Sequence, residues 1–351
     1  MISFYPGPSQ VYEKVPKWVK TAYDEGILGI NHRSAKFEHM VADVYRLLQE
    51  KLGVPADYTI SFVSSSTECW EIIAQSFVLE NTFHLFSGTF GEKWCKTTKP
   101  LVAEAAGYQF DFQEGLDLDQ IIIPEDVEVI CVTHNETSNG TQIRPSLVAG
   151  LREKYPDTLI AIDATSSMAG VALNFELADL WFASVQKCFG LPAGMGILIC
   201  SPAAAARAEE LQRRNHYNSW LKLKDNAQKH QTHLTPNVLD IYLLQQSMQD
   251  RKPIDKVDEK ILSRYQQWSG FISQLPRVDW LVRQEALRSR TVLALTGESS
   301  VLSSLHKKAE AAGFTLGKGY GDWKKSTLRI ANFPAMKRDA IEALQAALIS
   351  E

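Results

Sequence analysis

One lysine of this chain stands where its chemistry would be unusual. Lys187 follows the apolar run of residues 180–183 and precedes a glycine-rich stretch over residues 190–196. This pattern predicts that the lysine lies at the end of a buried strand, on a short turn before another strand. Its stem could be buried with the charged head in solvent. A lone ammonium group in apolar surroundings instead tends to lose its proton, and the neutral amine can form a Schiff base with an aldehyde.

An aspartate occupies a comparable position 24 residues earlier (187 − 163). Asp163 ends the apolar run of residues 158–162 and is followed by the small hydroxyl residues 165–167. The run predicts a buried parallel strand, and ligands of open α/β sheets bind outside the carboxyl ends of the strands. Asp163 could simply cap a helix. Together with Lys187 it indicates a site for pyridoxal 5′-phosphate (PLP), whose ring nitrogen needs a carboxylate partner.

The surrounding elements alternate between strand and helix. A strand over residues 59–63 runs into a Ser-Ser-Ser-Thr turn, and a helix over residues 68–79 follows. Further strands are expected over residues 81–86 and 127–133. Strand, short polar loop and helix in repeated order predict an α/β fold with a mostly parallel sheet flanked by helices.

The C-terminal part has a different pattern and predicts a second domain. It contains a long helix over residues 254–275, strand-like segments near 291–296 and 326–332, and a final helix from Lys337. This combination predicts a smaller α+β domain. The domain limits that we expect are 15–250 for the large PLP-binding domain and 251–351 for the small one, with residues 1–14 packing nearby.

Several short motifs occur in an order that is similar to one superfamily. They are Pro6-Gly7-Pro8, Asn31-His32-Arg33-Ser34, Ser64-Ser65-Ser66-Thr67-Glu68, Asn135-Glu136-Thr137-Ser138-Asn139-Gly140, Asp163-Ala164-Thr165-Ser166-Ser167 and Ser184-Val185-Gln186-Lys187. In this order and spacing the chain resembles the class V aminotransferases, which are PLP-dependent enzymes of fold type I. It is most similar to their phosphoserine aminotransferase branch.

The resemblance implies a cofactor site with PLP bound to Lys187 and the ring nitrogen held by Asp163, these two being the catalytic residues. Phe90 would stack on the ring, with Trp94 as the alternative. The remaining implied contacts are Ser66, Thr67 and Gln186 at the phosphate, Thr137 near the phenolic oxygen, and Thr235 donated by a second subunit. The turn before the helix also fits the phosphate on physical grounds, because a helix N-terminus offers N–H donors and a positive dipole.

The resemblance also implies substrate-binding residues. Arg329 would grip the α-carboxylate, while His32 and Arg33 would reach the side-chain anion across a homodimer with shared active sites. The chain departs from the phosphoserine branch in several places, among them Leu234, which replaces a usual asparagine, and the run of residues 317–321, which is more similar to other class V members. Thr67 stands where that branch has an arginine, and residues 322–325 replace a His-Arg pair. Lys318, Lys324 or Lys325 could supply the missing charge.

Composition excludes several other classes. The chain has 351 residues, of which 45% are hydrophobic and 22% charged, and its net charge is −4. With no basic block, apolar membrane span or signal sequence, we expect no nucleic-acid or membrane partner. Five scattered cysteines favour a reduced, cytoplasmic protein. His230 and His233 lack a nearby third ligand, so no metal site is expected.

The expected reaction is the transfer of an amino group from phosphoserine to 2-oxoglutarate, giving 3-phosphohydroxypyruvate and glutamate, as in serine biosynthesis. An alanine or serine aminotransferase that uses glyoxylate or pyruvate is the first alternative. A non-catalytic binding protein on the same PLP fold is the second. The residues alone leave the donor, the acceptor and the direction open.

Overall fold

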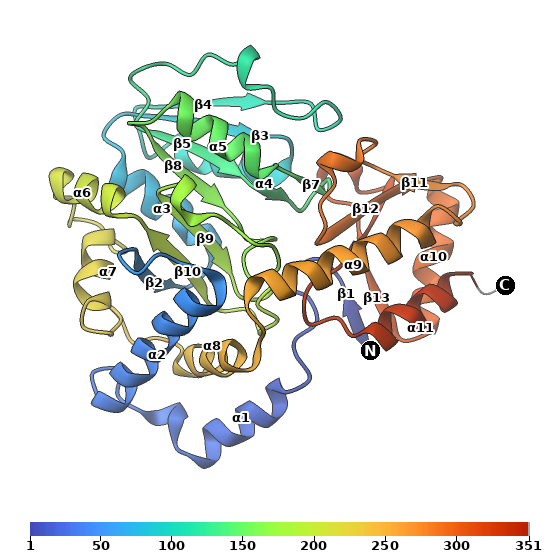
Figure 1. The fold of residues 1–351 in the computed structure, drawn as a ribbon, viewed down its shortest axis with the longest axis horizontal. Helices are drawn as coiled ribbons and strands as arrows, with labels where there is room; N and C mark the ends of the chain where they lie inside the picture. Colours follow the sequence, from blue (N-terminus) through green and yellow to red (C-terminus); the bar gives the residue numbers. More distant parts are fainter. Residues whose placement is uncertain (350–351) are drawn as a thin grey trace.

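A computed structural model describes residues 1–349 of the chain, which is built around two β-sheets of unequal size (Figure 1). The larger sheet has seven strands in the order β2-β10-β9-β8-β5-β3-β4. Its strands are β2 (Thr59–Val63), β3 (Asn81–Phe86), β4 (Glu104–Gln109), β5 (Val129–Thr133), β8 (Leu159–Asp163), β9 (Leu180–Ser184) and β10 (Gly196–Cys200).

All strand pairs of this sheet are parallel except the two that β10 makes. Because β10 runs antiparallel to both β2 and β9, these two neighbours run in the same direction as β8. The carboxyl ends of β2, β8 and β9 therefore meet at one edge of the sheet. A short hairpin of β6 (Asn135–Glu136) and β7 (Thr141–Gln142) follows β5 at that same edge. The predicted α/β fold with a mostly parallel sheet is confirmed.

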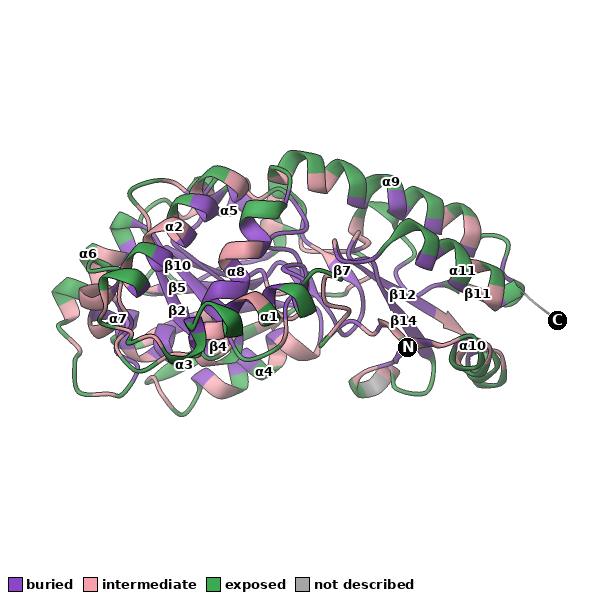
Figure 2. Cartoon of the chain, turned by 90° about the horizontal axis from the view of Figure 1, so that it is seen from below, coloured by how far each residue is buried: buried purple, intermediate pink, exposed green. Residues whose placement is uncertain are grey.

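Helices cover both faces of the large sheet, so its strands are buried (Figure 2). One face packs against α3 (Ser66–Phe77), α4 (Thr89–Thr98), α6 (Pro202–Leu211) and α7 (Trp220–Ala227), with the tryptophans of this group at its centre. The other face packs against α1 (Val15–Asp24), α2 (Ala35–Leu52), α5 (Pro145–Lys154) and α8 (Val238–Asp250). Continuously apolar strands are what such two-sided burial requires.

The smaller sheet has five strands in the order β1-β13-β14-β12-β11. Its strands are β1 (Ile2–Phe4), β11 (Val278–Trp280), β12 (Val292–Gly297), β13 (Phe314–Lys318) and β14 (Thr327–Ala331). It packs with α9 (Ile254–Ile272), α10 (Ser299–Ala311) and α11 (Arg338–Ile349), and α9 extends from the larger sheet to the smaller one (Figure 1). The first residues do more than pack nearby, because β1 pairs in parallel with β13 as an edge strand. The proposed domain limits remain a prediction.

Most element limits agree with the sequence expectations to within a few residues, and the helix after β2 shows why small shifts arise. It begins at Ser66 rather than at Glu68, because the Ser65 side chain accepts a hydrogen bond from the Glu68 N–H and so caps the helix. The longer α2 begins after Ser34, which caps it in the same way. No helix among residues 1–349 is long and apolar enough to cross a membrane.

Candidate active site

The shared edge of the large sheet holds a cavity of about 190 Å³ that contains most of the predicted site residues. Lys187 follows β9, Asp163 ends β8, and Ser66 begins α3 directly after β2. Arg329 reaches the same cavity from β14 of the smaller sheet. The cavity therefore lies between the two sheets.

Lys187 is buried, and two hydroxyl groups hold its amine. Its Nζ donates to Thr137 Oγ1 at 3.0 Å and to Ser166 Oγ at 2.9 Å, and it lies 5.4 Å from the centre of the Phe90 ring. Burial lowers the pKa of Lys187 from 10.5 to about 8, and the charge of Asp163 opposes this fall. A sizeable fraction of the amine is thus neutral near physiological pH, as the sequence interpretation of this lysine expects.

Gly7 lies directly against the lysine stem. A Cβ atom at this position would stand 2.8 Å from Lys187 Cε, and the φ angle of +148° is one that other residues rarely adopt. Because Gly7 has no side chain, the backbone of the Pro-Gly-Pro segment can approach the lysine closely. This segment therefore forms a wall of the site.

Asp163 is also buried, with one carboxylate oxygen accepting a hydrogen bond from the Thr165 N–H at 2.9 Å. Burial raises the pKa of Asp163, while the Thr165 hydrogen bonds and the positive charge of Lys187 oppose the rise. The carboxylate lines the cavity, where it is available to a cationic or N–H-bearing ligand.

The N-terminus of α3 supplies the side of the cavity that suits an anion. The Ser66 N–H donates to Ser184 Oγ at 2.7 Å, and that hydroxyl in turn donates to Ser66 Oγ. Thr67 is exposed and lines the cavity beside Ser66, and Gln186 lines it from the turn before Lys187. Backbone N–H groups and the helix dipole favour a phosphate at this place.

Two aromatic residues were candidates for stacking on a bound ring, and the structure separates them. Phe90 lines the cavity and stacks on Tyr320 with 5.1 Å between ring centres and 22° between ring planes. Trp94 is fully buried in the helix layer and stacks on Trp70, outside the cavity lining. The geometry therefore favours Phe90.

Glu136 fixes the start of the helix that carries Phe90. Its carboxylate accepts hydrogen bonds from the N–H groups of Phe90 at 3.1 Å, Gly91 at 3.2 Å and Ser138 at 2.9 Å. A Cβ atom on Gly88 would stand 2.6 Å from Glu136 Cγ, so the chain passes too close for a larger residue. The carboxylate thereby caps the N-terminus of α4.

Arg329 is buried and oriented by backbone carbonyls. Its Nε donates to the Lys318 carbonyl at 2.8 Å and its Nη1 to the Thr137 carbonyl at 2.7 Å, and its guanidinium carbon lies 5.6 Å from the centre of the Tyr320 ring. Burial lowers the pKa of Arg329, although a guanidinium remains charged at any physiological pH. A fixed cation at the wall of a cavity is suited to bind a carboxylate.

Three predicted residues do not reach the cavity of this chain. Arg33 is exposed, and its Nη1 donates to Asn226 Oδ1 at 2.9 Å and to Gln231 Oε1 at 2.6 Å. His32 and Thr235 likewise lie outside the cavity lining, and Thr235 is exposed. The resemblance assigns Thr235 and the His32-Arg33 pair to a partner subunit's site, so their roles remain predictions.

The three lysines expected to compensate for the missing arginines lie elsewhere. Lys318, Lys324 and Lys325 line a separate cavity in the small-sheet region. A different lysine, Lys93 of α4, contacts the active-site wall through its amine, because its Nζ donates to the Tyr320 hydroxyl at 2.6 Å. Sequence reasoning passed over Lys93 because a charged residue on an amphipathic helix is ordinarily a solvated surface group.

Other residues that line the cavity or contact Lys187 were also missed in the sequence. Ser166 and Asn135 stand inside motifs that the resemblance rests on, so position within those motifs was a usable signal. Tyr5 and Tyr320 gave no such signal, because each comes to the site through tertiary packing of segments far apart in the sequence.

The residues present fit a polar aromatic ligand such as PLP. Two cavity-lining side chains have buried polar atoms without a hydrogen-bond partner among the described residues: Thr133 Oγ1 and both amide atoms of Asn135. Buried polar groups are normally satisfied, so this cluster indicates a ligand that pairs with them. A carboxylate, a helix N-terminus and an aromatic face surround the same space.

This fold and site define an aminotransferase of the PLP-dependent type. The sequence pattern of the class-V aminotransferase family matches residues 4–309, and the chain belongs to this family of enzymes. The predicted family is thereby confirmed, and the alternative of a non-catalytic binding protein is set aside.

Individual relatives are consistent with that membership. A solved phosphoserine aminotransferase from Cytophaga hutchinsonii is 32% identical, with a TM-score of 0.95, covering 99% of this chain and 98% of its own. The phosphoserine aminotransferase of Rhodococcus opacus is 27% identical, covering 96% of this chain and 91% of the relative. An alanine–glyoxylate aminotransferase from Nostoc has a TM-score of 0.84 at 16% identity, over 99% of this chain and 94% of its own, which shows a shared fold alone.

Proposed function

We propose that this enzyme binds PLP and transfers the amino group of phosphoserine to 2-oxoglutarate. The observation that carries the proposal is the similarity to the phosphoserine aminotransferase of Cytophaga hutchinsonii along 99% of the chain, with a TM-score of 0.95. The phosphoserine aminotransferases of Rhodococcus and Corynebacterium extend this support, at 27% and 26% identity.

The cofactor would occupy the cavity around Lys187. Asp163 would hold the ring nitrogen, Phe90 would stack on the ring, and Thr137 would lie near the phenolic oxygen. The phosphate would bind at Ser66, Thr67 and Gln186, with Thr235 contributed by the partner subunit. When bound, PLP supplies an aldehyde that exchanges amino groups and a ring that withdraws electrons from the substrate α-carbon.

The amine of Lys187 would carry the proton during the reaction. With its pKa lowered to about 8, its Nζ can accept the proton of the substrate α-carbon and later return one. The hydroxyls of Thr137 and Ser166, at 3.0 and 2.9 Å, hold Nζ in the cavity and orient its hydrogens. The ionised carboxylate of Asp163 in the same buried space would stabilise a protonated ring nitrogen there.

Two arginines would recognise the substrate at its two ends. Arg329 would hold the α-carboxylate, since its guanidinium is fixed at the cavity wall by two backbone carbonyls. His32 and Arg33 of the partner subunit would hold the side-chain phosphate. A phosphate bound by an arginine gains charge-assisted hydrogen bonds that serine or alanine cannot form.

One observation favours the alternative of an alanine or serine aminotransferase with glyoxylate or pyruvate. Within the described residues, Arg329 is the one arginine that lines the cavity, and Thr67 stands where the phosphoserine branch has another. A single chain thus offers little positive charge for a second anion. The two proposals differ in whether a partner subunit completes the site.

The test is a comparison of amino donors with purified holoenzyme. We expect the kcat/KM for phosphoserine with 2-oxoglutarate to exceed that for serine or alanine with any acceptor. Arg33→Ala should lower the kcat/KM for phosphoserine by roughly 10- to 150-fold, the effect of losing one charged contact, and leave alanine nearly unchanged. Arg329→Ala should impair all donors alike.

Lys36→Ala, an exposed change close to Arg33, is the matched control and should leave both donors unaffected. A wild-type preference for alanine or serine with glyoxylate or pyruvate would reject phosphoserine as the donor and support the alternative.

A further inference from the structure

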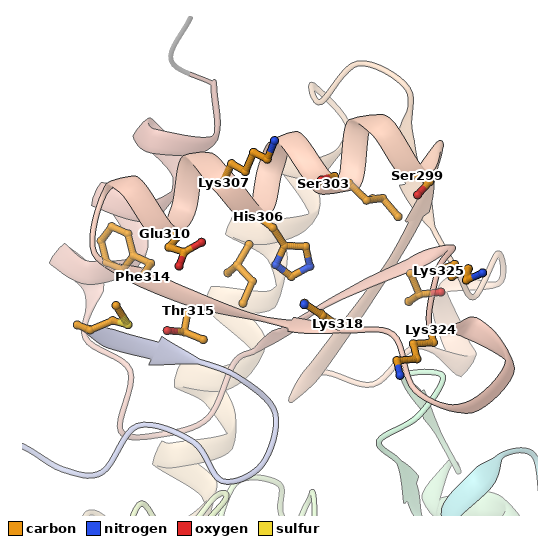
Figure 3. A pocket seen from close by; sticks show the side chains of 14 residues that line it. Ser299, Ser303, His306, Lys307, Glu310, Phe314, Thr315, Lys318, Lys324 and Lys325 are labelled. Carbon is orange, nitrogen blue, oxygen red and sulfur yellow. The ribbon is translucent and has the colours of Figure 1, made fainter.

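A second cavity, of about 550 Å³, lies between α10 and the strand β13 of the small sheet (Figure 3). Among the described residues it shares no lining residue with the candidate active site. Four lysines line it, Lys307, Lys318, Lys324 and Lys325, against one carboxylate, Glu310. None of the four makes an ion pair with a side chain that the structure describes.

The positive side chains of this cavity are spread along it, with Lys318 beside His306 (Figure 3). Figure 3 shows the His306 ring and the Lys318 amine directed toward the same space, with Lys324 and Lys325 at one end. Burial lowers the pKa of His306, and the charge of Lys318 adds to the effect. Positive charges gathered in a concave surface repel one another and create a positive potential. A bound anion would reduce this repulsion.

A buried hydroxyl in the same cavity lacks a partner. Thr327 is 3% exposed, lines the cavity from β14, and its Oγ1 makes no hydrogen bond with any described residue. Buried polar atoms are nearly always paired, so an unpaired one beside a charged cavity indicates a ligand oxygen. This observation is independent of the lysine cluster.

The remaining wall is apolar and sets the size of the ligand. Leu302, Phe314 and Leu316 lie along one side of the cavity. The volume falls in the range of small-molecule sites, roughly 300–1,000 Å³, and exceeds the need of a bare phosphate ion. Lysines bind phosphate as point charges, while an apolar wall accepts a carbon skeleton.

We propose that this cavity binds a small organic phosphate ester and that its occupancy strengthens substrate binding at Arg329. The connection runs through one short segment. The Lys318 side chain lines the cavity, while its backbone carbonyl accepts a hydrogen bond from Arg329 Nε at 2.8 Å. Two residues further on, Tyr320 lines the active site and stacks on Phe90.

The segment over residues 318–325 therefore contributes Lys318, Lys324 and Lys325 to one cavity and Tyr320 to the other. A ligand held by Lys318 and Lys324 would fix this segment in the position that orients Arg329. Coupling of this kind is reciprocal, so a carboxylate bound at Arg329 would also strengthen binding of the phosphate ester. The binding site itself does not depend on the proposed function, whereas the coupling rests on the proposed role of Arg329.

Binding is tested by isothermal titration calorimetry of the PLP-loaded enzyme with glycerol 3-phosphate as the probe. The double variant Lys318→Met/Lys324→Met should weaken binding by about 10-fold or more, because two charged contacts are lost. Lys17→Met/Lys252→Met removes the same charge from exposed positions and should bind as the wild type does. Absence of binding to the wild type, or equal binding to both double variants, would overturn the site.

The chemical class is tested with succinate and sulfate as competing anions. Glycerol 3-phosphate should bind more tightly than sulfate, which lacks the carbon skeleton, and than succinate, which lacks the phosphate. Equal affinity for all three would reject a phosphate ester and leave unspecific charge attraction as the explanation.

Coupling is tested by the affinity for succinate, an unreactive dicarboxylate, followed through the absorbance of the bound cofactor. Saturating glycerol 3-phosphate should lower the Kd of succinate by about 5-fold or more in the wild type and have no such effect in Lys318→Met/Lys324→Met. If glycerol 3-phosphate instead competes with succinate within the active site, the Kd of succinate should rise in both proteins, and this would contradict the coupling. The existence of the second site would still be decided by the calorimetric titration.

Discussion

The amine of Lys187 is held by hydroxyl groups and not by a carboxylate in direct contact. Thr137 and Ser166 both lie within hydrogen-bond distance of Nζ, and neither carries charge. A contacting carboxylate would stabilise the ammonium form and raise its pKa, whereas hydroxyls leave burial as the dominant influence. The site thereby keeps its lysine ready to lose a proton while Asp163, more distant, still limits the shift.

The lowered pKa of Lys187 predicts how fast the cofactor-free protein captures PLP at different pH values. The neutral amine is the nucleophile, so the capture rate should rise about tenfold per pH unit below pH 8 and level off above it. An amine with the ordinary pKa of 10.5 would keep rising through that range. Stopped-flow absorbance of the cofactor measures the rate, and a rise that continues unchanged to pH 10 would contradict the shift.

Lys187→Ala serves as the control, since it should show no pH-dependent capture step. It should also lose transamination by more than the ~10²–10⁴-fold that proton transfer alone contributes, because the nucleophile vanishes as well.

The lowered pKa of Lys187 also affects the stability of the fold. The native cofactor-free protein binds the Lys187 proton less tightly than the unfolded chain does. Burial of the charged amine therefore lowers the free energy of unfolding by its full amount below pH 8. This loss disappears, and the free energy of unfolding increases, as the pH rises from 8 toward 10.5.

Residues at strand ends were the part of the site that the sequence could predict. Asp163 and Lys187 each follow a continuous apolar run, and parallel strands place such ends together. Lys318 shows the opposite case. A sequence identifies it as a nearby positive charge, but only the pairing of β13 with β14 decides that its carbonyl, and not its amine, faces Arg329.

At the scale of elements, the position of Phe90 depends on how α4 begins. The helix has no side-chain cap from its own N-cap residue, Gly88. Glu136 of the β6–β7 hairpin takes that role from 46 residues away in sequence, through the N–H groups of Phe90 and Gly91. A local capping pattern could not have indicated this, because the capping group belongs to another element.

Replacing Glu136 with glutamine tests this arrangement. The glutamine side chain has one acceptor oxygen instead of two and directs N–H groups at backbone donors, so we expect a loss of about 1–3 kcal/mol. The melting temperature should fall by several degrees, and KM for all amino donors should rise as Phe90 loses its position. Glu125→Gln, an exposed change, is the control. Glu136→Gln with the melting temperature and KM of the wild type would contradict the role.

The strands and helices that the sequence predicts are present, since most strands of the large sheet are apolar and helices carry caps such as Ser34 and Gly53. Several others were not predicted, namely α4, α5, α7, α10, β4 and β13. The edge strand β1 was not predicted. Three residues give too little periodicity to identify a strand, and its partner β13 lies more than 300 residues away.

At the scale of the whole molecule, Arg33 and Thr235 have predicted roles in an active site, but neither residue lines the cavity of its own chain. The Arg33 guanidinium donates hydrogen bonds to Asn226 and Gln231 of its own chain, and Thr235 is exposed. Their predicted roles require a second copy of the chain. The sequence of one chain does not show where that second copy would bind. A symmetric homodimer would place both residues at the partner's site.

Mixing two impaired variants tests shared sites directly. A dimer of Lys187→Ala and Arg33→Ala chains has one intact site if Arg33 acts in its partner, because the intact lysine and the intact arginine then meet. After dissociation and random reassociation of equal amounts, half of the dimers are mixed, and phosphoserine activity should reach about a quarter of the wild type. Restoration should fail if Arg33 serves its own chain.

The control mixes Lys187→Ala with Asp163→Ala. These residues line one cavity in one chain, so no mixed dimer contains a complete site. Light scattering confirms that the mixed species are dimers, and an active monomer would contradict the arrangement.

The pairing of β1 with β13 has a consequence for the order of events during protein synthesis. Ile2 lies opposite Phe314, so the strand made first waits for a partner that leaves the ribosome 312 residues later (314 − 2). At 5–20 residues per second this interval is roughly 15–60 s. The large sheet can assemble in that time, but the wall of the site that Tyr320 and Arg329 form cannot exist until β13 and β14 have been made. The nascent chain thus carries Lys187 in a site that lacks this wall until β14 has left the ribosome.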